Sequence, residues 1–285
     1  MIVSIFANLN IDEIEGITRQ ALSVLKETDC KVFLADEFKA RIGDIHSDFL
    51  PESEFMSVCD VAIVIGGDGS TMKAAKNAAI LGKPTLGINA GRLGFLSGIE
   101  KNELHLLKKI AEGDYRADER IMLKAEITEN GKVTDTFHCL NDAVLSRGDL
   151  ARLIDINITS DGRDLMNVRA DGVIISTPTG STAYSLAAGG PILSPDLNCF
   201  VITSICPHSI MDRSTVVNSS DKLTVDVSSD VNNNSFLTCD GEPPIKISGN
   251  SKVIVSLSPY KARLIRLKPD NFYEVLKKKI IERRI

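Results

Sequence analysis

The sequence predicts two domains: an α/β domain with a doubly wound, Rossmann-like parallel sheet, followed by a mostly β domain. Residues 1 to about 113 alternate short β-rich runs with helical periodicity, which is the pattern of βαβ units. Beyond about residue 116 the helical patterns nearly vanish, and short strands are separated by turn signals. We therefore predict an α/β domain over residues 1–115, joined by a C-terminal helix over 270–285, and a mostly β domain over 116–269.

The first half contains the elements of a parallel sheet in order. Ile2 to Ala7 and Lys31 to Ala35 read as strands, and apolar residues at helical spacing lie between them, from Ile14 to Leu25. Val61 to Ile65 is entirely apolar, as expected for a strand covered on both faces, and it leads directly into glycines. A helix is expected from about Thr71 to Leu81, where a glycine and then a proline follow.

The second half reads as short strands joined by turns. Clear turn signals occur at Glu129–Lys132 and Ser160–Gly162. The later strands are predicted at Leu223–Val227, Phe236–Cys239, Val253–Leu257 and Leu264–Leu267. A last helix is expected over Phe272–Ile281, and the basic tail that it carries, with lysines at 277–279 and arginines at 283 and 284, reads as a solvated helix face.

Composition narrows the class of protein. The formal net charge of -5 and a sequence pI near 5.5 argue against a nucleic-acid partner. No signal peptide and no run of 18 apolar residues can be found, so no membrane partner is expected. The six cysteines are scattered without a CxxC pair or metal-ligand spacing, which favours reduced thiols and a cytoplasmic location, with no metal held by the chain itself.

A glycine loop, Gly66-Gly67-Asp68-Gly69-Ser70, lies where an apolar strand ends and a helix is expected to begin. Ligands of open α/β sheets bind at such points, because the first turn of a helix offers unpaired N–H groups to an anion. The loop differs from both the Walker A pattern and the GxGxxG fingerprint. It therefore predicts a phosphate site of another kind, although a tight strand-to-helix turn capped by Asp68 is the alternative interpretation.

Asp68 calls for a further explanation, because a carboxylate repels the phosphate beside which it is predicted to lie. An acid in this place can accept the proton of a sugar hydroxyl that attacks phosphorus, a role worth roughly 10²- to 10⁴-fold in rate. Since phosphoryl transfer has a loose transition state, most of the acceleration is expected from positioning and from charge neutralisation by Mg²⁺ and basic side chains.

A second group of polar residues runs from Asp171 to Ala187. It reads as a strand, a hydroxyl-rich turn around Pro178 and Gly180, and the start of a helix, and its hydroxyl groups suit a ribose or a phosphate. Alone, it could equally be a Ser/Thr-rich helix cap with a structural tyrosine.

Together, four motifs closely resemble the NAD kinase family: the glycine loop, the segment Leu86–Leu96, the pair Asn141-Asp142 and the stretch from Asp171 onward. The match spans roughly residues 60 to 245. It implies the two-domain NAD kinase fold and transfer of the terminal phosphoryl group of ATP, or of another donor such as polyphosphate, to the 2′-hydroxyl of the adenosine ribose of NAD. It also implies Mg²⁺ with the donor, NAD and ATP as small-molecule substrates, and a homo-oligomer, expected to be a homotetramer.

The resemblance also assigns residues. Asp68 matches the catalytic proton acceptor, Gly69 lines the NAD site, and Lys73 matches a basic position one turn into the helix. The remaining NAD-binding candidates are Asn141, Asp142, Arg152, Arg169, Asp171, Thr182, Ala183, Tyr184, Ser185, Leu186, Ala187 and Glu242. Two positions depart from the family pattern, since Ser70 stands where Thr is usual and Asp142 where Glu is usual.

Two other functions are compatible with parts of the sequence. A lipid or sugar kinase can carry a similar GGDG loop, but neither explains the hydroxyl-rich stretch after Asp171, and no membrane-facing surface is evident. A noncatalytic NAD-binding sensor predicts a missing acid in the glycine loop, whereas Asp68 is present.

Overall fold

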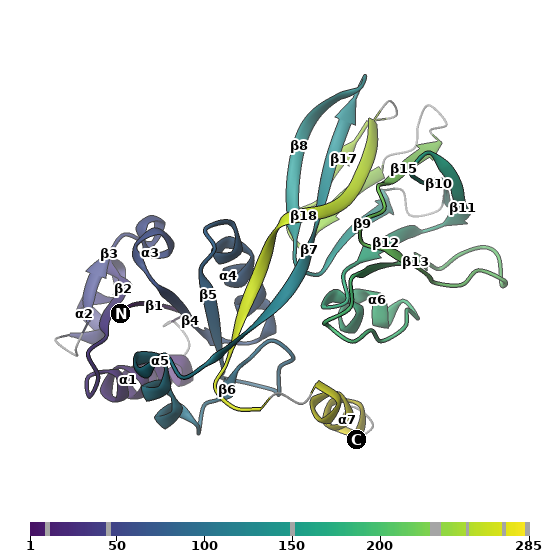
Figure 1. Ribbon diagram of the computed structural model, residues 1–285. Coiled ribbons are helices and arrows are strands. Elements are labelled where there is room, and N and C mark those ends of the chain that lie inside the picture. The colour runs from purple at the N-terminus through teal and green to yellow at the C-terminus, as the bar shows by residue number, and fades with distance from the viewer. Residues whose placement is uncertain are drawn as a thin grey trace. The chain divides into compact units, whose positions relative to one another are not determined.

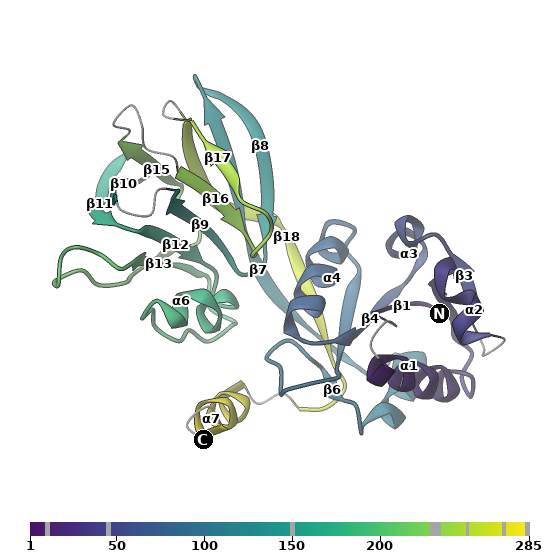
Figure 2. The same cartoon turned by 180° about the vertical axis from the view of Figure 1, so that it is seen from behind.

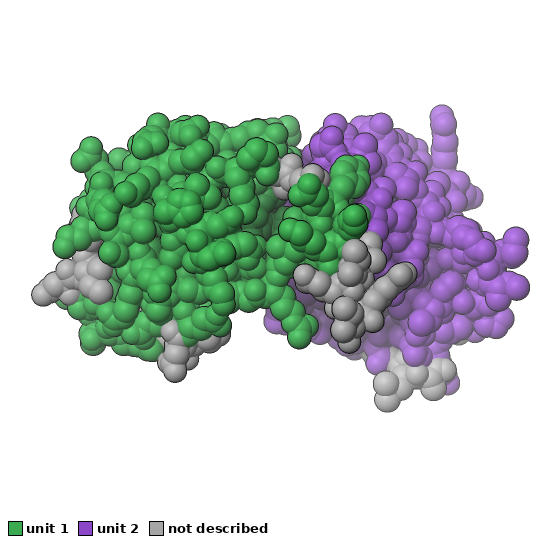
Figure 3. Space-filling view, turned by 90° about the horizontal axis from the view of Figure 1, so that it is seen from below, with its two compact units in different colours: residues 1–119, 261–285 green, residues 120–260 purple. Residues whose placement is uncertain are grey.

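A computed structural model describes residues 1–8, 12–43, 47–148, 152–228, 235–248, 251–269 and 272–282. The chain forms two compact units, which Figure 3 distinguishes by colour: unit 1 comprises Met1–Glu119 and Lys261–Ile285, and unit 2 comprises Arg120–Tyr260. Two long strands, β7 (Arg116–Glu129) and β18 (Ser251–Arg266), contribute residues to both units. Within the described ranges, no helix combines the length and the hydropathy needed to cross a membrane.

Unit 1 contains the predicted parallel sheet, with strand order β5-β4-β1-β2-β3. Its strands are β1 (Ile2–Ala7), β2 (Lys31–Ala35), β3 (Asp48–Leu50), β4 (Val61–Gly66) and β5 (Pro84–Asn89). The end of β18 pairs in parallel with β5, and the short strand β6 (Ile99–Glu100) also pairs with β5. The predicted doubly wound α/β fold is confirmed, and the strand order reverses between β1 and β4.

Helices cover both faces of this sheet (Figures 1 and 2). They are α1 (Asp12–Leu25), η1 (Asp36–Phe38), α2 (Lys39–Ile42), α3 (Glu52–Val58), α4 (Asp68–Ile80), η2 (Leu104–Leu107) and α5 (Lys108–Glu112). Unit 1 also contains the last helix, α7 (Phe272–Glu282). Along β1, Val3 and Ile5 belong to the hydrophobic core that α1 and α5 share. The alternate residues Ser4 and Phe6 contact Phe55 of α3 on the opposite face. This alternation is the period of two of a β-strand.

Helix α4 begins three residues earlier than predicted. We expected it from about Thr71, yet it begins at Asp68, after Gly67 in an extended conformation. The carbonyl of Gly67 already accepts the first helical hydrogen bond, from the N–H of Thr71 at 3.0 Å, and the Thr71 hydroxyl donates to it as well, at 3.1 Å. Because glycine has a low helix propensity, we predicted Gly69 to lie in a loop. Gly69 is instead helical, because α4 packs on β4 and β5.

Unit 2 is a sandwich of two antiparallel sheets. One sheet has the order β11-β10-β15-β18 with β7 and β8 beside β18, and the other has the order β14-β13-β12-β9-β16-β17. The elements are β8 (Lys132–Cys139), β9 (Asp142–Arg147), β10 (Ile154–Ser160), β11 (Arg163–Ala170), β12 (Gly172–Ser176), η3 (Gly180–Thr182), α6 (Tyr184–Ala187), β13 (Cys199–Ile205), β14 (Thr215–Asn218), β15 (Leu223–Ser228), β16 (Ser235–Cys239) and β17 (Ile245–Ile247). Their inward side chains form one apolar core, as predicted for a mostly β domain.

Strand β18 is continuous where two strands were predicted. Pro259 lies between the predicted runs Val253–Leu257 and Leu264–Leu267 and reads as a break, because proline cannot donate to a strand ladder. The strand nevertheless persists, since its first half pairs with β15 and its last residues pair with β5. Pairing partners that lie far away in the sequence therefore override the local signal.

Gly98 lies in a closely packed part of unit 1, where there is no room for a side chain. A Cβ added to Gly98 would lie against the carbonyl oxygen of Ile265, far inside contact distance, and 2.6 Å from a methyl carbon of Leu86. Gly98→Ala is therefore expected to lower the free energy of unfolding by about 1 to 3 kcal/mol through overpacking. Urea denaturation followed by circular dichroism measures this. Gly91→Ala is the matched control, because its Cβ meets open space; equal midpoints for both variants would contradict the packing argument.

Candidate active site

Asp68 lies at the point of the unit 1 sheet where ligands are expected. It is the first residue of α4 and follows β4 after Gly67, so it lies at the carboxyl end of β4. The neighbouring strand β1 runs parallel to β4, and the strand order reverses between them. Ligands of open α/β sheets bind at such a reversal point, outside the carboxyl ends of the strands.

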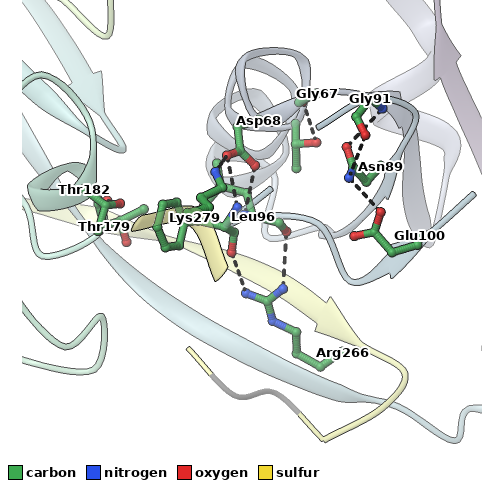
Figure 4. Close-up of polar contacts among 12 residues, drawn as sticks. Gly67, Asp68, Asn89, Gly91, Leu96, Glu100, Thr179, Thr182, Arg266 and Lys279 are labelled. Carbon is green, nitrogen blue, oxygen red and sulfur yellow. Dashed lines mark hydrogen bonds and ion pairs between the residues drawn. The ribbon is translucent and has the colours of Figure 1, made fainter. Parts of the chain in front are cut away.

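Two backbone amides hold the Asp68 carboxylate (Figure 4). The N–H of Phe95 donates to Oδ2 at 3.0 Å, and the N–H of Leu96 donates to Oδ1 at 3.1 Å. A side chain on Gly94 would collide with this carboxylate, so glycine is required at that position. Because each oxygen has its own donor, the plane of the carboxylate is set by the segment that follows β5, and about a third of the side chain stays exposed.

Arg266 binds backbone carbonyl groups of the segment that follows β5. Arg266 is 5% exposed. Its guanidinium donates to the carbonyl of Ser97 at 2.6 Å, with longer contacts of 3.4 Å to the carbonyls of Phe95 and Leu96. It also forms an ion pair with Asp118 at 3.6 Å. Sequence reasoning missed Arg266. The available signal was an arginine directly after the apolar pair Leu264-Ile265, at the end of a strand that reads as buried.

Lys279 corrects the prediction for the basic tail. Its ammonium lies 3.1 Å from Oδ2 of Asp68 and 4.0 Å from the centre of the Phe95 ring (Figure 4). The side chain is 19% exposed. A solvated face was predicted for all three lysines of this helix, and that prediction is correct for Lys277 and Lys278 but wrong for Lys279, which faces the carboxylate. Arg283 and Arg284 lie outside the described residues.

A cavity of about 300 Å³ adjoins the start of α4. Its walls include Ala7 and Asn8 at the end of β1, and Ser70, Lys73 and Asn77 on α4. Lys73 is exposed and borders this space one turn after Asp68, and Gly69 is exposed in the first turn. A cation next to the amino end of a helix favours an anionic ligand such as a phosphate.

In unit 2, a second carboxylate organises the turn that holds Asn141 and Asp142. Asp240 accepts three backbone N–H groups, from Leu140 at 2.9 Å, from Asn141 at 2.8 Å and from Asp142 at 3.1 Å. Asp240 has a positive φ of 50°, a conformation that aspartate tolerates better than most residues. Sequence reasoning noted Asp240 merely as a neighbour of Glu242. An Asp-Gly pair directly after a strand was the signal for a turn of this kind.

The hydroxyl-rich segment packs directly against this turn. The Ser176 hydroxyl and the Thr177 N–H both donate to the carbonyl of Asn141, at 3.1 and 2.9 Å. A Cβ on Gly180 would collide with the same carbonyl. Of the predicted residues that follow, Thr182 and Leu186 are half-buried, Ser185 is buried and bonded to Thr203, and Ala183, Tyr184 and Ala187 are exposed. Glu242, just beyond Asp240, is also exposed.

Three other predicted residues lie elsewhere in unit 2. Asp171 precedes β12 and forms an ion pair with Arg147 at 2.8 Å. Asp142 lies opposite Ser176 in the β9–β12 ladder, at the other end of β12. From Asp171 to Ser176 a strand advances roughly 16 Å. Arg169 is exposed on β11, with a distant ion pair to Asp155, and Arg152 is exposed outside any strand. The structure therefore does not bring these three residues together with Asn141.

Burial changes the chemistry of Asp142. The residue is 5% exposed, and this burial, together with the nearby Asp240 carboxylate, raises the pKa of Asp142 to about 7. Desolvation disfavours the anion, and a second negative charge does so further. Asp142 is therefore a group that exchanges its proton near neutral pH. No cluster of three or more His, Cys, Asp or Glu side chains suited to a metal ion occurs in the parts of the chain that the structure describes.

Family models match most of the chain. Residues 3–115 match the ATP-NAD kinase N-terminal domain, and residues 140–267 match the ATP-NAD kinase C-terminal domain. The NAD kinase of Acetivibrio thermocellus is 34% identical over 282 residues, covering 99% of this chain and 97% of that protein. The NAD kinase of Symbiobacterium thermophilum is 38% identical over 277 residues, covering 95% and 96%. The chain belongs to the NAD kinase family. Its activity is therefore that of an NAD kinase, a phosphotransferase.

Solved structures agree on the fold. A yeast NADH kinase in complex with NADH superposes with a TM-score of 0.87 at 24% identity, covering 96% of this chain and 85% of that one. An NAD kinase from Archaeoglobus fulgidus in complex with ATP superposes with a TM-score of 0.76 at 22% identity, covering 98% of both chains. The predicted two-domain NAD kinase fold is thus confirmed.

The raised pKa of Asp142 predicts how stability depends on pH. The ordinary value of 3.8 applies to the unfolded chain and a value of about 7 to the folded one, so between these pH values the folded state binds more protons. Stability attributable to Asp142 is present at low pH and is lost as the pH rises from about 4 to 7. Asp142→Asn removes this loss, so its stability relative to the wild type should rise by on the order of 3 to 4 kcal/mol between pH 4 and pH 8.

Urea unfolding of both proteins at several pH values measures the effect. The exposed Asp114, which pairs with Lys109, supplies the control variant Asp114→Asn. Parallel pH profiles for the wild type and Asp142→Asn would contradict the raised pKa.

Proposed function

We propose that this kinase transfers the terminal phosphoryl group of ATP to the 2′-hydroxyl of the adenosine ribose of NAD, with Asp68 as the proton acceptor. The observation that carries the proposal is a carboxylate held by two backbone N–H groups at the start of α4, beside the carboxyl ends of β1 and β4. A group fixed in this way needs little reorganisation to meet a hydroxyl, and positioning supplies much of the rate in phosphoryl transfer.

The chemical step involves one proton and one phosphoryl group. The ribose 2′-oxygen forms a bond to the γ-phosphorus of ATP while Asp68 accepts the 2′-hydroxyl proton. The bond from the γ-phosphorus to the β,γ-bridging oxygen breaks, and ADP leaves with that electron pair. NADP is the second product, and the proton passes from Asp68 to solvent. Orienting the acceptor and accepting its proton is worth roughly 10²- to 10⁴-fold in rate.

The donor is proposed to enter as its Mg²⁺ complex. The chemistry of the cavity beside α4 supports a polyphosphate, since the exposed Lys73 and the first turn of the helix border it. Two comparisons point to ATP: the matched family model is described as that of ATP-NAD kinases, and the structurally similar Archaeoglobus protein was solved with ATP. Mg²⁺ would be bound chiefly by the phosphates of the donor, as is usual for nucleotide substrates.

NAD binding is assigned to the turn and the hydroxyl-rich segment of unit 2. Asn141, Asp142 and the residues from Thr182 to Ala187 belong to two segments that are bonded to each other, and Glu242 lies in the turn after Asp240. For Gly69, the NAD-contacting role rests on the family resemblance. The yeast NADH kinase was solved with NADH, which supports a dinucleotide as the ligand class.

The position of Asp171 supports an oligomer. Asp171, Arg169 and Arg152 match NAD-contacting positions of the family, yet Asp171 lies roughly 16 Å of strand away from Ser176 and the Asn141 turn. We propose that this group serves the site of another copy in a homo-oligomer, with the homotetramer as the expected state. A cytoplasmic location likewise stays a prediction from sequence.

Two rival functions predict different products. A lipid or sugar kinase predicts a phosphorylated lipid or sugar and no NADP, and a noncatalytic NAD sensor predicts binding without turnover. The sensor is disfavoured by the tightly oriented carboxylate of Asp68, which a binding site for a polyanion does not need.

The direct test incubates the protein with NAD, ATP and Mg²⁺ and detects NADP with an NADP-specific dehydrogenase. Asp68→Asn should lower kcat by about 10²- to 10⁴-fold, because the amide cannot accept the proton, while the affinity for NAD changes little. Asp114→Asn, at an exposed ion pair of the same unit, should keep its activity. Formation of a lipid or sugar phosphate without NADP, or near-normal turnover by Asp68→Asn, would refute the assignment.

Subunit complementation tests the oligomer. Asp171→Asn is expected to raise KM for NAD more than it lowers kcat, and co-expression of Asp68→Asn with Asp171→Asn should restore activity above that of either variant alone. The restoration occurs because a mixed oligomer can combine an intact Asp68 from one copy with an intact Asp171 from another. Analytical ultracentrifugation checks the assembly, and a monomer with full activity would overturn this proposal.

A further inference from the structure

Three consecutive lysines on α7 differ sharply in their surroundings. Lys277 and Lys278 are exposed, whereas the ammonium of Lys279 lies 3.1 Å from Asp68 and over the ring of Phe95. Neither the glycine loop nor the hydroxyl-rich segment accounts for this contact, which joins positions 211 residues apart. Long lysine side chains usually extend into water, so a lysine held against a carboxylate and an aromatic face needs an explanation.

Helix α7 is anchored to the Asp68 environment at two points. The ring of Phe272 lies 5.9 Å from the ring of Phe95, and Lys279 approaches the same ring at 4.0 Å. Residues 272 and 279 are seven apart, so they lie two turns apart on the same face of the helix. Phe95 also supplies one of the amides that bind Asp68. The helix face that carries Lys279 is therefore aligned with the segment that orients the carboxylate.

The chemistry of the proposed reaction creates a need for such a cation. Asp68 has to accept a proton while a donor with several negative charges lies beside it, and like charges at close range repel. Backbone amides are neutral overall and orient the carboxylate without cancelling its charge. Of the donors that reach Asp68 in the described parts of the chain, Lys279 carries a full positive charge.

We propose that Lys279 is a positioning residue of the reaction, acting through Asp68. Its ammonium fixes Oδ2 together with the Phe95 amide and offsets the negative charge of the carboxylate against the phosphates of the donor. Oδ1 bonds to the Leu96 amide and has a further lone pair for the hydroxyl proton. The inference rests on the proposed function, since it assigns Lys279 to the step in which Asp68 acts.

The test begins with Lys279→Met, which keeps an unbranched apolar stem against Phe95 and removes the charge. We expect kcat for NADP formation to fall by about 10-fold or more, while KM for NAD changes by less than about 2-fold. Lys279→Arg should recover most of the activity, because it restores a cation. Lys277→Met is the matched control on the exposed face and should behave as the wild type. Thermal denaturation of every variant checks folding, and Lys279→Gln replaces the Met variant if that one does not fold.

A double-mutant cycle decides whether Lys279 acts through Asp68. In the Asp68→Asn background, Lys279→Met should cost less than about 2-fold, because the group that it serves is already absent. A further loss of 10-fold or more in that background would overturn the proposal, since Lys279 would then act independently. Unchanged or increased turnover of Lys279→Met in the wild-type background would overturn it too, and an increase would identify the contact as inhibitory. These results presuppose that the wild type forms NADP, so absence of NADP would instead count against the proposed function.

Discussion

The carboxylate of Asp68 depends on two backbone N–H groups that lie more than 25 residues away in the sequence, those of Phe95 and Leu96. Those amides can point at Asp68 because Gly94 leaves room for the carboxylate and because Arg266 holds the adjoining carbonyls. Arg266 is itself delivered by β18, whose end pairs with β5. The sheet, the loop after β5 and the last strand thus together set the orientation of one side chain.

Unit 2 uses the same interaction for a different purpose. Asp240 also binds backbone N–H groups, yet it shapes a turn, and the residues of that turn carry the proposed binding function. In unit 1 the backbone orients the carboxylate that we propose as the proton acceptor, whereas in unit 2 a carboxylate orients the backbone. Hydrogen bonds to an ionised acceptor are stronger than neutral ones, which explains why both turns are built on aspartate.

The sequence predicted those elements that depend on interactions between neighbouring residues. The apolar run Val61–Ile65 predicted β4, and the glycines after it indicated the candidate site, since strand burial and turn chemistry depend on neighbours in sequence. The roles of Arg266 and Lys279 could not be predicted, because their partners lie 169 and 211 residues away. Asn141 and Asp142 were found by family resemblance, and nothing in their local sequence indicated that Asp142 is buried beside a second acid.

The two aspartates of the candidate site have different electrostatic surroundings. Asp68 has the ammonium of Lys279 at 3.1 Å, so its carboxylate lies beside a positive charge. Asp142 is buried with Asp240 nearby, and these two factors raise its pKa to about 7, so it is protonated more readily than an ordinary aspartate. A protonated carboxyl can donate a hydrogen bond as well as accept one. Asp142 is therefore suited to a ligand group that offers an acceptor, whereas Asp68 is suited to one that offers a proton.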